Sequence, residues 1–210
     1  MTETLYSEDY FLSYRDRPYS RDEPRWAEFF GLVARNIDEK LSPTKVFDAG
    51  CAIGFLVEAL RARGIEAFGR DYSEYAISKV PVGLAPFCDC GSIADPIPGE
   101  YDLVTCIEVL EHMPADEGRQ AIANLCAAAP RVFFSSTPTD FTEETHINVQ
   151  PPLHWMEIFA EQGFAPRAYF DGTFLCSWAI LFERRNERPT PHELEAQARL
   201  VLTRMEKSEN

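Results

Sequence analysis

The chain has 210 residues, enough for one domain with a sizeable core, because a chain of this length buries roughly 70% of its unfolded surface. The hydrophobic content of 45% and the charged content of 26% are those of an ordinary globular protein. The net charge of -14 disfavours an enzyme of nucleic acids, which needs a basic face to neutralise phosphates. A small acceptor with little charge fits this balance better.

The first ten residues are polar and acidic, without the basic and apolar regions of a signal peptide. The chain has no apolar run near the ~18 residues that a membrane span needs. We therefore expect a cytoplasmic protein that does not bind membranes, with its six cysteines reduced.

Residues 1–23 hold a cluster of tyrosines that predicts an N-terminal arm or lid, or an arm that packs on the core. A helix is predicted from Pro24 to about residue 40, because proline suits a first helical turn and apolar residues recur at helical spacing. Strands and helices then alternate. The predicted strands are 45–49, 66–70, 84–88, 101–106 and 131–136, and the predicted helices are 55–63, 73–80, 114–129 and 151–163.

Two apolar runs follow, 164–170 and 174–182, on either side of a hairpin-like turn at Asp171-Gly172. Five strand–helix alternations predict a parallel sheet covered on both faces, and the closing pair without a helix predicts one antiparallel strand at the end. Residues 186–210 are predicted to form a helical tail. In such sheets ligands bind beyond the carboxyl ends of the strands.

The segment after the first predicted strand has the pattern of strand, glycine loop and helix. Gly50 can adopt positive φ and allow a ligand close to the backbone. Gly54 lets the next helix begin close to the strand. The spacing is G-x-x-x-G rather than the G-x-G-x-x-G of dinucleotide folds, so no pyrophosphate cradle is predicted.

Asp71 follows the second predicted strand, 21 residues after Gly50. A carboxylate about 20 residues after the glycine loop is the group that binds ribose hydroxyls in βαβ units. The other interpretation is a loop aspartate that caps the next helix. The glycine loop favours ribose binding.

These motifs together resemble a class I S-adenosylmethionine-dependent methyltransferase, over about residues 25–185. The resemblance rests on the ordered set of Asp48-Ala-Gly-Cys-Ala-Ile-Gly54, Asp71, Asp89 and residues 101–112. It implies an α/β, Rossmann-like, mostly parallel seven-stranded sheet with the last strand antiparallel and helices on both faces. Residues 24–185 would form the domain that binds S-adenosylmethionine.

The resemblance also implies which residues contact the cofactor. Gly50 to Gly54 would pack against its methionine part, and Asp48 would orient its ammonium group. Asp71 would hold the ribose, and Asp89 the adenine amine. The full implied set is Asp48, Gly50, Cys51, Ala52, Gly54, Asp71, Tyr72, Asp89, Cys90, Ile107 and Glu108.

Two loops supply candidate catalytic residues, since both follow strands at the same rim of the predicted sheet. Glu111 and His112 follow the fourth strand, and His146 follows the fifth. Histidine is the natural base near neutral pH, and transfer to an alcohol requires one. The other interpretations are a packing role for His112 and a loop hydrogen bond for His146.

Glu108, Glu111, His112 and His146 also resemble the metal-binding set of small-RNA 2′-O-methyltransferases, where a divalent ion gathers two ribose hydroxyls. Carboxylates with histidines suit Mg²⁺ or Mn²⁺. The chain departs from that family because it is acidic and lacks a basic strip for RNA. A metal here would align a sugar diol.

The polar and aromatic residues downstream predict the acceptor site and suit a carbohydrate: Asn148, Gln150, Trp155 and Tyr169. Residues 134–152 resemble actinobacterial methyltransferases of glycan assembly. We therefore expect an O-methyltransferase of a sugar-like small molecule, with methylated-mannose polysaccharide synthesis as one candidate pathway. The alternatives are a quinone-type phenol, as in ubiquinone-pathway enzymes, an amine, a nicotinamide-dependent oxidoreductase and a non-catalytic nucleoside-binding module.

Overall fold

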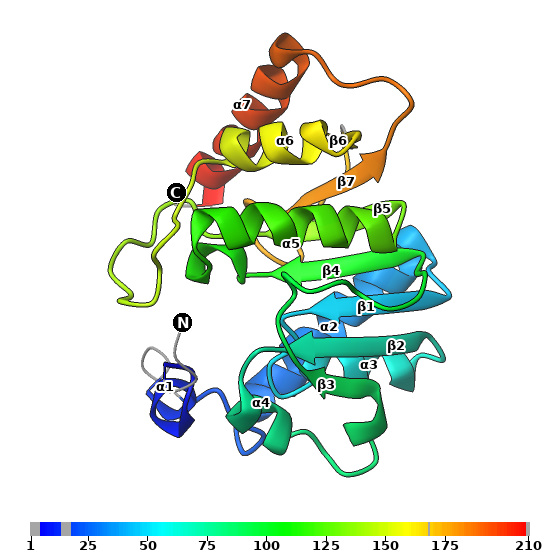
Figure 1. The fold of residues 1–210 in the computed structure, drawn as a ribbon, viewed down its shortest axis with the longest axis vertical. Coiled ribbons are helices and arrows are strands. Elements are labelled where there is room, and N and C mark those ends of the chain that lie inside the picture. Colours follow the sequence, from blue (N-terminus) through cyan, green and yellow to red (C-terminus); the bar gives the residue numbers. More distant parts are fainter. Residues whose placement is uncertain (1–4, 14–17, 168, 209–210) are drawn as a thin grey trace. The chain divides into compact units, whose positions relative to one another are not determined.

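The computed structural model describes residues 5–13, 18–167 and 169–208. Its seven strands form a sheet of order β3-β2-β1-β4-β5-β7-β6 (Figure 1). The β7 strand runs antiparallel to both β5 and β6, whereas β1–β2, β2–β3 and β4–β5 are parallel pairs. The predicted fold class is thus confirmed. The strands are β1 (Lys45–Ala49), β2 (Glu66–Asp71), β3 (Cys88–Cys90), β4 (Leu103–Ile107), β5 (Arg131–Ser135), β6 (Phe164–Pro166) and β7 (Ile180–Arg184).

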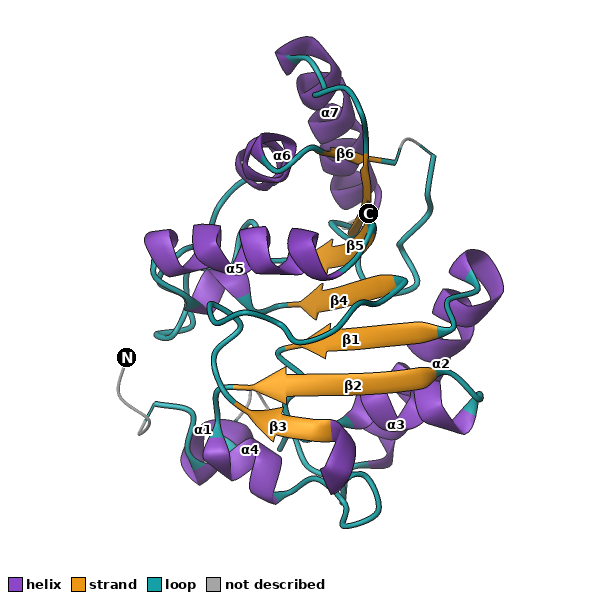
Figure 2. Ribbon diagram, turned by 45° about the vertical axis from the view of Figure 1, so that its right-hand side comes forward, coloured by secondary structure: helices purple, strands orange, loops and turns teal. Residues whose placement is uncertain are grey.

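The chain divides into two compact units, Met1–Ile93 and Ala94–Asn210. In the first unit, α2 packs on α3, and α3 packs on β2 (Figure 2). The buried face of α2 holds Val33, Ile37 and Leu41, at the helical spacing that predicted it. The Ser73 hydroxyl accepts a hydrogen bond from the Ala76 amide and caps α4. The helices of this unit are α1 (Glu8–Leu12), α2 (Pro24–Leu41), α3 (Phe55–Ala62) and α4 (Glu74–Ser78).

The N-terminal arm packs within the first unit. Phe11 of α1 is buried with Ile53 and Phe55, next to the glycine loop. The Ser73 hydroxyl donates to the Tyr6 carbonyl at 2.6 Å. Tyr6, Tyr10 and Tyr19 join this aromatic cluster, whereas Tyr14 lies outside the described residues. A lid role for the arm stays a prediction.

The second unit is built around aromatic side chains of β5, β7 and α6. The rings of Phe159 and Phe182 stack at 3.9 Å between centroids, and Trp155 meets Phe134 edge to face. The α7 helix, predicted as the tail, packs on α6. The helices of this unit are α5 (Ala115–Ala128), α6 (Pro152–Glu161) and α7 (Pro191–Ser208). No helix of the described residues combines the length and apolar character needed to cross a bilayer.

Two predicted strand regions differ in the structure. Residues 85–87 form a 3₁₀ turn and β3 begins only at Cys88, because Pro86 lacks the N–H that a ladder needs. The two strands predicted on either side of Asp171 are shorter and the connection between them is longer, since β6 ends at Pro166 and β7 begins at Ile180. The aromatic residues between them pack as a loop, with Phe170 and Phe174 against Phe133.

A glycine inside β2 allows the glycine loop to lie directly against the sheet. A Cβ at Gly69 would come within 2.5 Å of the Cys51 Cβ and 2.9 Å of Val57 Cγ2. Distances below 3.0 Å are too short for real Cβ contacts. Gly69 was not among the predicted site residues, although an isolated glycine inside a strand signals a close backbone approach.

We predict that Gly69→Ala lowers the free energy of unfolding by about 1–3 kcal/mol, the usual cost of overpacking a core. Gly31→Ala is the matched control, because a Cβ there meets no atom within 4 Å and alanine favours a helix by up to about 1 kcal/mol. Urea denaturation of both variants measures the difference. Equal stability of the two variants would contradict the close approach at Gly69.

Candidate active site

The glycine loop between β1 and α3 is held by the end of β2. The amides of Gly50 and Cys51 donate to the Arg70 carbonyl at 2.8 and 3.0 Å. Positive φ angles occur at Gly50, Ala52 and Gly54, at 84°, 46° and 81°. Ala52 is strained by about 1–2 kcal/mol in this region, where glycine is not. The loop therefore keeps a conformation that its neighbours must stabilise.

Asp71 supplies that stabilisation. Its Oδ2 accepts from the Ala52 amide at 2.8 Å, and its Oδ1 accepts from the Ser73 amide at 2.8 Å. Burial raises the pKa of Asp71, against the opposing effect of these two amides. Each carboxylate oxygen can accept more than one hydrogen bond, so a ribose hydroxyl can bind beside the amides. Asp71 thus binds the amide of Ser73, the residue that caps α4, rather than capping the helix itself, and the ribose contact stays a prediction.

The other predicted cofactor residues of the first unit surround this loop. Asp48 is buried, whereas Tyr72 is 41% exposed. The Cys51 thiol donates a hydrogen bond to the Cys88 side chain, and this bond, together with burial, raises the pKa of Cys51 well above its usual range, so its thiol stays protonated. Asp89 forms an ion pair with Arg70 at 2.6 Å, and Cys90 beside it is exposed.

Ile107 and Glu108 lie in the second unit, at the end of β4. The Glu108 backbone has a φ of 53°, and its amide donates to the Ser135 carbonyl of β5 at 3.0 Å. Its Oε1 accepts from the Trp178 indole at 2.9 Å. Glu108 is therefore held by β5 and Trp178.

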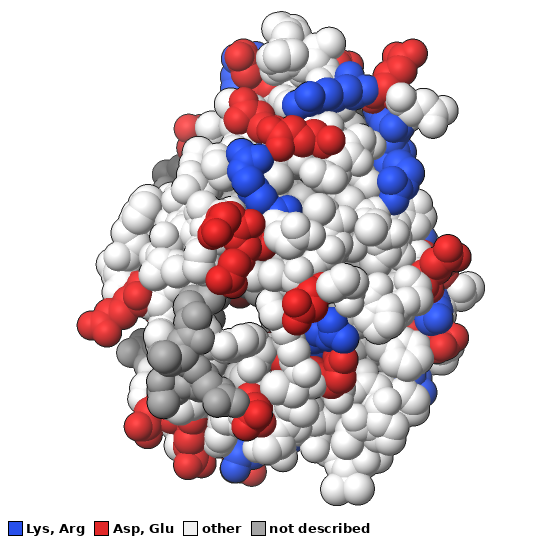
Figure 3. Space-filling view, viewed as in Figure 1, with Lys and Arg blue, Asp and Glu red and all other residues white. Residues whose placement is uncertain are grey.

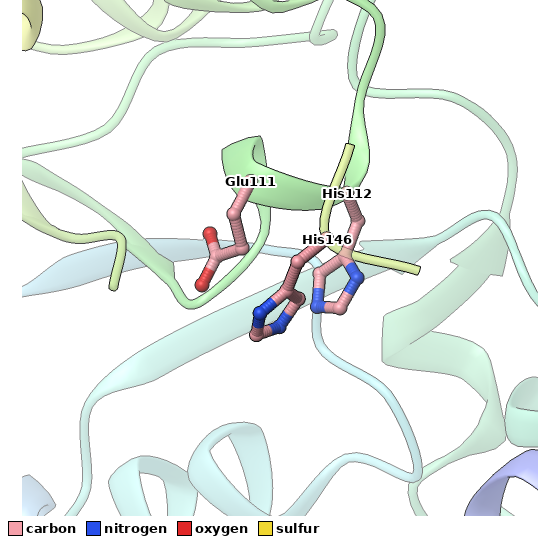
Figure 4. A group of neighbouring side chains, drawn as sticks. All are labelled: Glu111, His112 and His146. Carbon is pink, nitrogen blue, oxygen red and sulfur yellow. The ribbon is translucent and has the colours of Figure 1, made fainter. Parts of the chain in front are cut away.

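Glu111, His112 and His146 come together in the second unit (Figure 4). One ligand atom of each lies within 4.8 Å of the others. Glu111 and His112 belong to the 3₁₀ turn η2 (Leu110–His112), and His146 comes from the loop after β5. Among the described residues, Glu108 is not part of this group. The structure thus brings together three of the four predicted metal ligands and all three predicted catalytic residues.

Glu111 is a fully buried carboxylate. Its Oε1 accepts from the Thr137 amide at 3.2 Å. The Ser136 hydroxyl lies near enough to oppose the rise of its pKa, but Oε2 makes no hydrogen bond of regular geometry among the described residues. Burial, reinforced by the charge of Glu108, raises the pKa of Glu111 well above its usual range. An unpartnered buried carboxylate oxygen is costly, which favours a proton or a cation on it.

The two histidines lie side by side, with ring centroids 4.6 Å apart. His146 Nδ1 lies 2.8 Å from the Asp140 carbonyl. Because a carbonyl only accepts, this nitrogen carries the hydrogen. His112 Nδ1 lies 3.0 Å from the Thr145 hydroxyl. Burial and the neighbouring His146 lower the pKa of His112 to about 4, so its ring is neutral at neutral pH.

The predicted acceptor residues do not form one surface. The Asn148 amide donates to the Glu111 carbonyl at 2.8 Å, and its side chain joins the Leu110 carbonyl and Gln150. Asn148 and Gln150 thus hold the turn that carries Glu111. Trp155 is 2% exposed in the core, and Tyr169 is 97% exposed.

Glu143 and Thr145 were missed by the sequence interpretation. Glu143 accepts from the Thr145 hydroxyl at 2.7 Å, and its other oxygen lies 3.3 Å from His146 Nε2. An acidic residue and a threonine in a polar loop carry no recognisable spacing. Only the fold of the loop places them beside the histidines.

We predict that acid destabilises the protein partly through His112. Its folded pKa of about 4 lies below the ordinary 6.5, so the unfolded state binds the proton more readily. This contribution to stability is full above about pH 6.5 and is lost as the pH falls towards 4. Between pH 7.5 and pH 5, wild type should lose about 2 kcal/mol more than His112→Gln. Urea denaturation with a chelator present measures both losses, and equal losses would contradict the shift.

Comparison with known proteins agrees with the motifs. Residues 19–169 match a family model described as a methyltransferase domain. The ubiquinone biosynthesis O-methyltransferase of Azoarcus sp. (strain BH72) is 34% identical over 110 residues, covering 48% of this chain and 47% of that protein. The same enzyme of Methylococcus capsulatus is 36% identical over 106 residues, covering 46% and 44%. The chain spans about half the length of these curated relatives.

Solved structures show the same fold. Magnesium protoporphyrin IX methyltransferase from Synechocystis PCC 6803 with bound SAH has a TM-score of 0.64 at 19% identity, covering 88% of this chain and all of that one. The mitomycin 7-O-methyltransferase has a TM-score of 0.58 at 16% identity, covering 85% and 61%. With its fold, its ordered motifs and the match over residues 19–169, the chain belongs to the methyltransferase domain family, among the class I S-adenosylmethionine-dependent methyltransferases.

Proposed function

We propose that the chain transfers the methyl group of S-adenosylmethionine to a hydroxyl of a small acceptor. The observation that carries this proposal is the group of Glu111, His112 and His146. A hydroxyl must lose its proton when it is methylated, and an imidazole nitrogen is a suitable base. A non-catalytic nucleoside-binding module would have no use for this group, and the G-x-x-x-G loop speaks against a nicotinamide oxidoreductase.

The cofactor supplies the reactive methyl group, and the protein supplies orientation and proton transfer. The glycine loop and Asp71 would hold the nucleoside and its methionine part. His112 and His146 are both candidates for the base: His112 contacts a hydroxyl through Nδ1, whereas His146 has its hydrogen on Nδ1 and its Nε2 lies 3.3 Å from a Glu143 oxygen. In that tautomer Nε2 is the accepting nitrogen.

We propose a sugar or glycan hydroxyl as the acceptor, because residues 134–152 resemble methyltransferases of glycan assembly. The second candidate is a quinone-type phenol, which the ubiquinone biosynthesis relatives favour. Trp155 is buried in the core, so its ring cannot stack on a sugar, and this weakens the case for a sugar acceptor. On the face seen in Figure 3, basic side chains form small groups next to acidic ones, which supports a small acceptor over a nucleic acid.

A divalent ion is the alternative occupant of the same group, since an imidazole nitrogen that binds the ion does not also accept a proton. The Glu111 Oε2 is buried without a hydrogen-bond partner among the described residues, and two imidazoles lie beside it. One carboxylate and two imidazoles suit Mn²⁺ better than Mg²⁺, which prefers oxygen ligands. When bound, the ion would supply positive charge that lowers the pKa of a hydroxyl. Glu108 would need to leave Trp178 to join it.

We predict that Asp71→Ala weakens binding of S-adenosylhomocysteine by about 1–3 kcal/mol, roughly 5- to 150-fold, because ribose hydroxyls lose their acceptor. Isothermal titration calorimetry measures the affinity, with the exposed Asp116→Ala as control. An analogue without ribose hydroxyls separates this role from the Ala52 bond. Asp71→Ala should bind both ligands equally, and a preserved preference for the ribose form would refute the assignment.

We predict methyl ether formation when labelled S-adenosylmethionine is incubated with hydroxylated acceptors. Monosaccharides, catechol-type phenols and amines form the panel, and mass spectrometry locates the methyl group. A chelator should lower turnover at least about tenfold, and added Mn²⁺ should restore it. Activity that a chelator leaves unchanged would dismiss the metal, and methylation confined to amines would overturn the O-methyltransferase assignment.

A further inference from the structure

The loop after β5 contains a hydrogen-bonded relay that ends on a catalytic candidate. We propose that Glu143 is a positioning residue which, through Thr145, holds His112 with its hydrogen on Nδ1 and its lone pair on Nε2. The inference rests on the proposed function for its consequence in catalysis. The relay consists of two hydrogen bonds within the second unit, one from Thr145 to Glu143 and one between His112 and Thr145.

The direction of the relay follows from what each group can donate. The Thr145 hydroxyl lies 2.7 Å from Glu143 Oε1, and an ionised carboxylate only accepts, so the hydroxyl hydrogen points to Glu143. The hydroxyl oxygen then accepts from its other neighbour, His112 Nδ1, at 3.0 Å. His112 Nδ1 must therefore carry a hydrogen. In the neutral ring this leaves the lone pair on Nε2.

The relay is shielded from water. Thr145 is 8% exposed, and the side chains of Glu143 and His146 are 22% and 5% exposed. Water competes poorly for such bonds, so they constrain the ring more than exposed bonds do. Carboxylates that orient a histidine in this way fix its tautomer in catalytic triads and in metal sites.

The loop itself is held by other bonds. The His146 amide donates to the Glu143 carbonyl at 3.0 Å, and the Ile147 amide donates to the Thr145 carbonyl at 3.1 Å. The Asn148 amide ties the loop to Glu111. These backbone bonds do not use the Glu143 carboxylate or the Thr145 hydroxyl. Replacing either side chain therefore leaves these backbone bonds in place.

One carboxylate reaches both histidines, which provides a matched pair of variants. Glu143 Oε2 lies 3.3 Å from His146 Nε2, whereas the Thr145 hydroxyl contacts Glu143 Oε1 and His112 Nδ1. Thr145→Val removes the link to His112 and leaves the Glu143 contact with His146. Thr145→Ser keeps the hydroxyl. Glu143→Gln can reverse the relay, because its amide can donate to the Thr145 hydroxyl.

The test is the tautomer of His112 by long-range ¹H–¹⁵N NMR, at neutral pH with a chelator and without any acceptor. Wild type and Thr145→Ser should show hydrogen on Nδ1. Thr145→Val and Glu143→Gln should populate the Nε2–H form, while Thr145→Val leaves the His146 signals in place. Amide spectra confirm that each variant is folded. A wild-type His112 with hydrogen on Nε2, or an unchanged tautomer in Thr145→Val, would overturn the relay.

The catalytic consequence is measured separately with an acceptor from the panel. Thr145→Val should lower kcat at least about tenfold with little change in KM, because a mis-set base slows proton transfer without weakening binding. Thr145→Ser should restore kcat. Absence of methylation by wild type would count against the proposed function and leave the NMR result intact. If Thr145→Val changes the tautomer of His112 but keeps the kcat of wild type, the position of the hydrogen on His112 has no part in catalysis.

Discussion

The bond between the Ala52 amide and the Asp71 carboxylate is the interaction on which the first unit, proposed to bind the cofactor, depends. It holds a non-glycine residue at positive φ in the turn after β1. The second oxygen of the same carboxylate begins α4 through the Ser73 amide. One half-buried group thus joins the turn after β1 to the end of β2, and its remaining acceptor capacity suits the proposed ribose contact. The backbone strain at Ala52 is tolerated because the Asp71 carboxylate binds the Ala52 amide. The partial burial of that carboxylate is tolerated because the Ala52 and Ser73 amides donate to it.

The second unit holds a group of polar side chains together inside an apolar core. Glu111 lies in the turn after β4 and binds the Thr137 amide after β5 with one oxygen, and its other oxygen is unpartnered within the described residues. Asn148 fastens its turn to the loop that carries His146. Such an arrangement is unfavourable for stability by itself. It is the kind of local conflict with packing that proteins retain at functional sites.

Much of this site could be predicted from the chain order of its residues. Asp48 lies near the end of the first predicted strand, Gly50 and Asp71 follow the first and second, and parallel strands place their ends at one edge. His112 and His146 were brought together by the same reasoning, and the structure places their rings 4.6 Å apart. Trp155 shows the limit, because an aromatic residue in a helix looks the same whether it faces a ligand or the core. Glu108 shows another, since its partner Trp178 is 70 residues away in the chain.

The sequence by itself determined the sheet, its antiparallel strand and the family, because hydrophobic periodicity and strand-end motifs are local signals. Tertiary structure alone decided which side chains share a partner. Gly69 cannot carry a side chain because Cys51 packs directly against it. Glu143 is connected to His112 because the Thr145 hydroxyl contacts both. The physical reason is that packing and hydrogen-bond direction depend on atoms brought together from distant parts of the chain, and spacing along the chain does not encode their orientation.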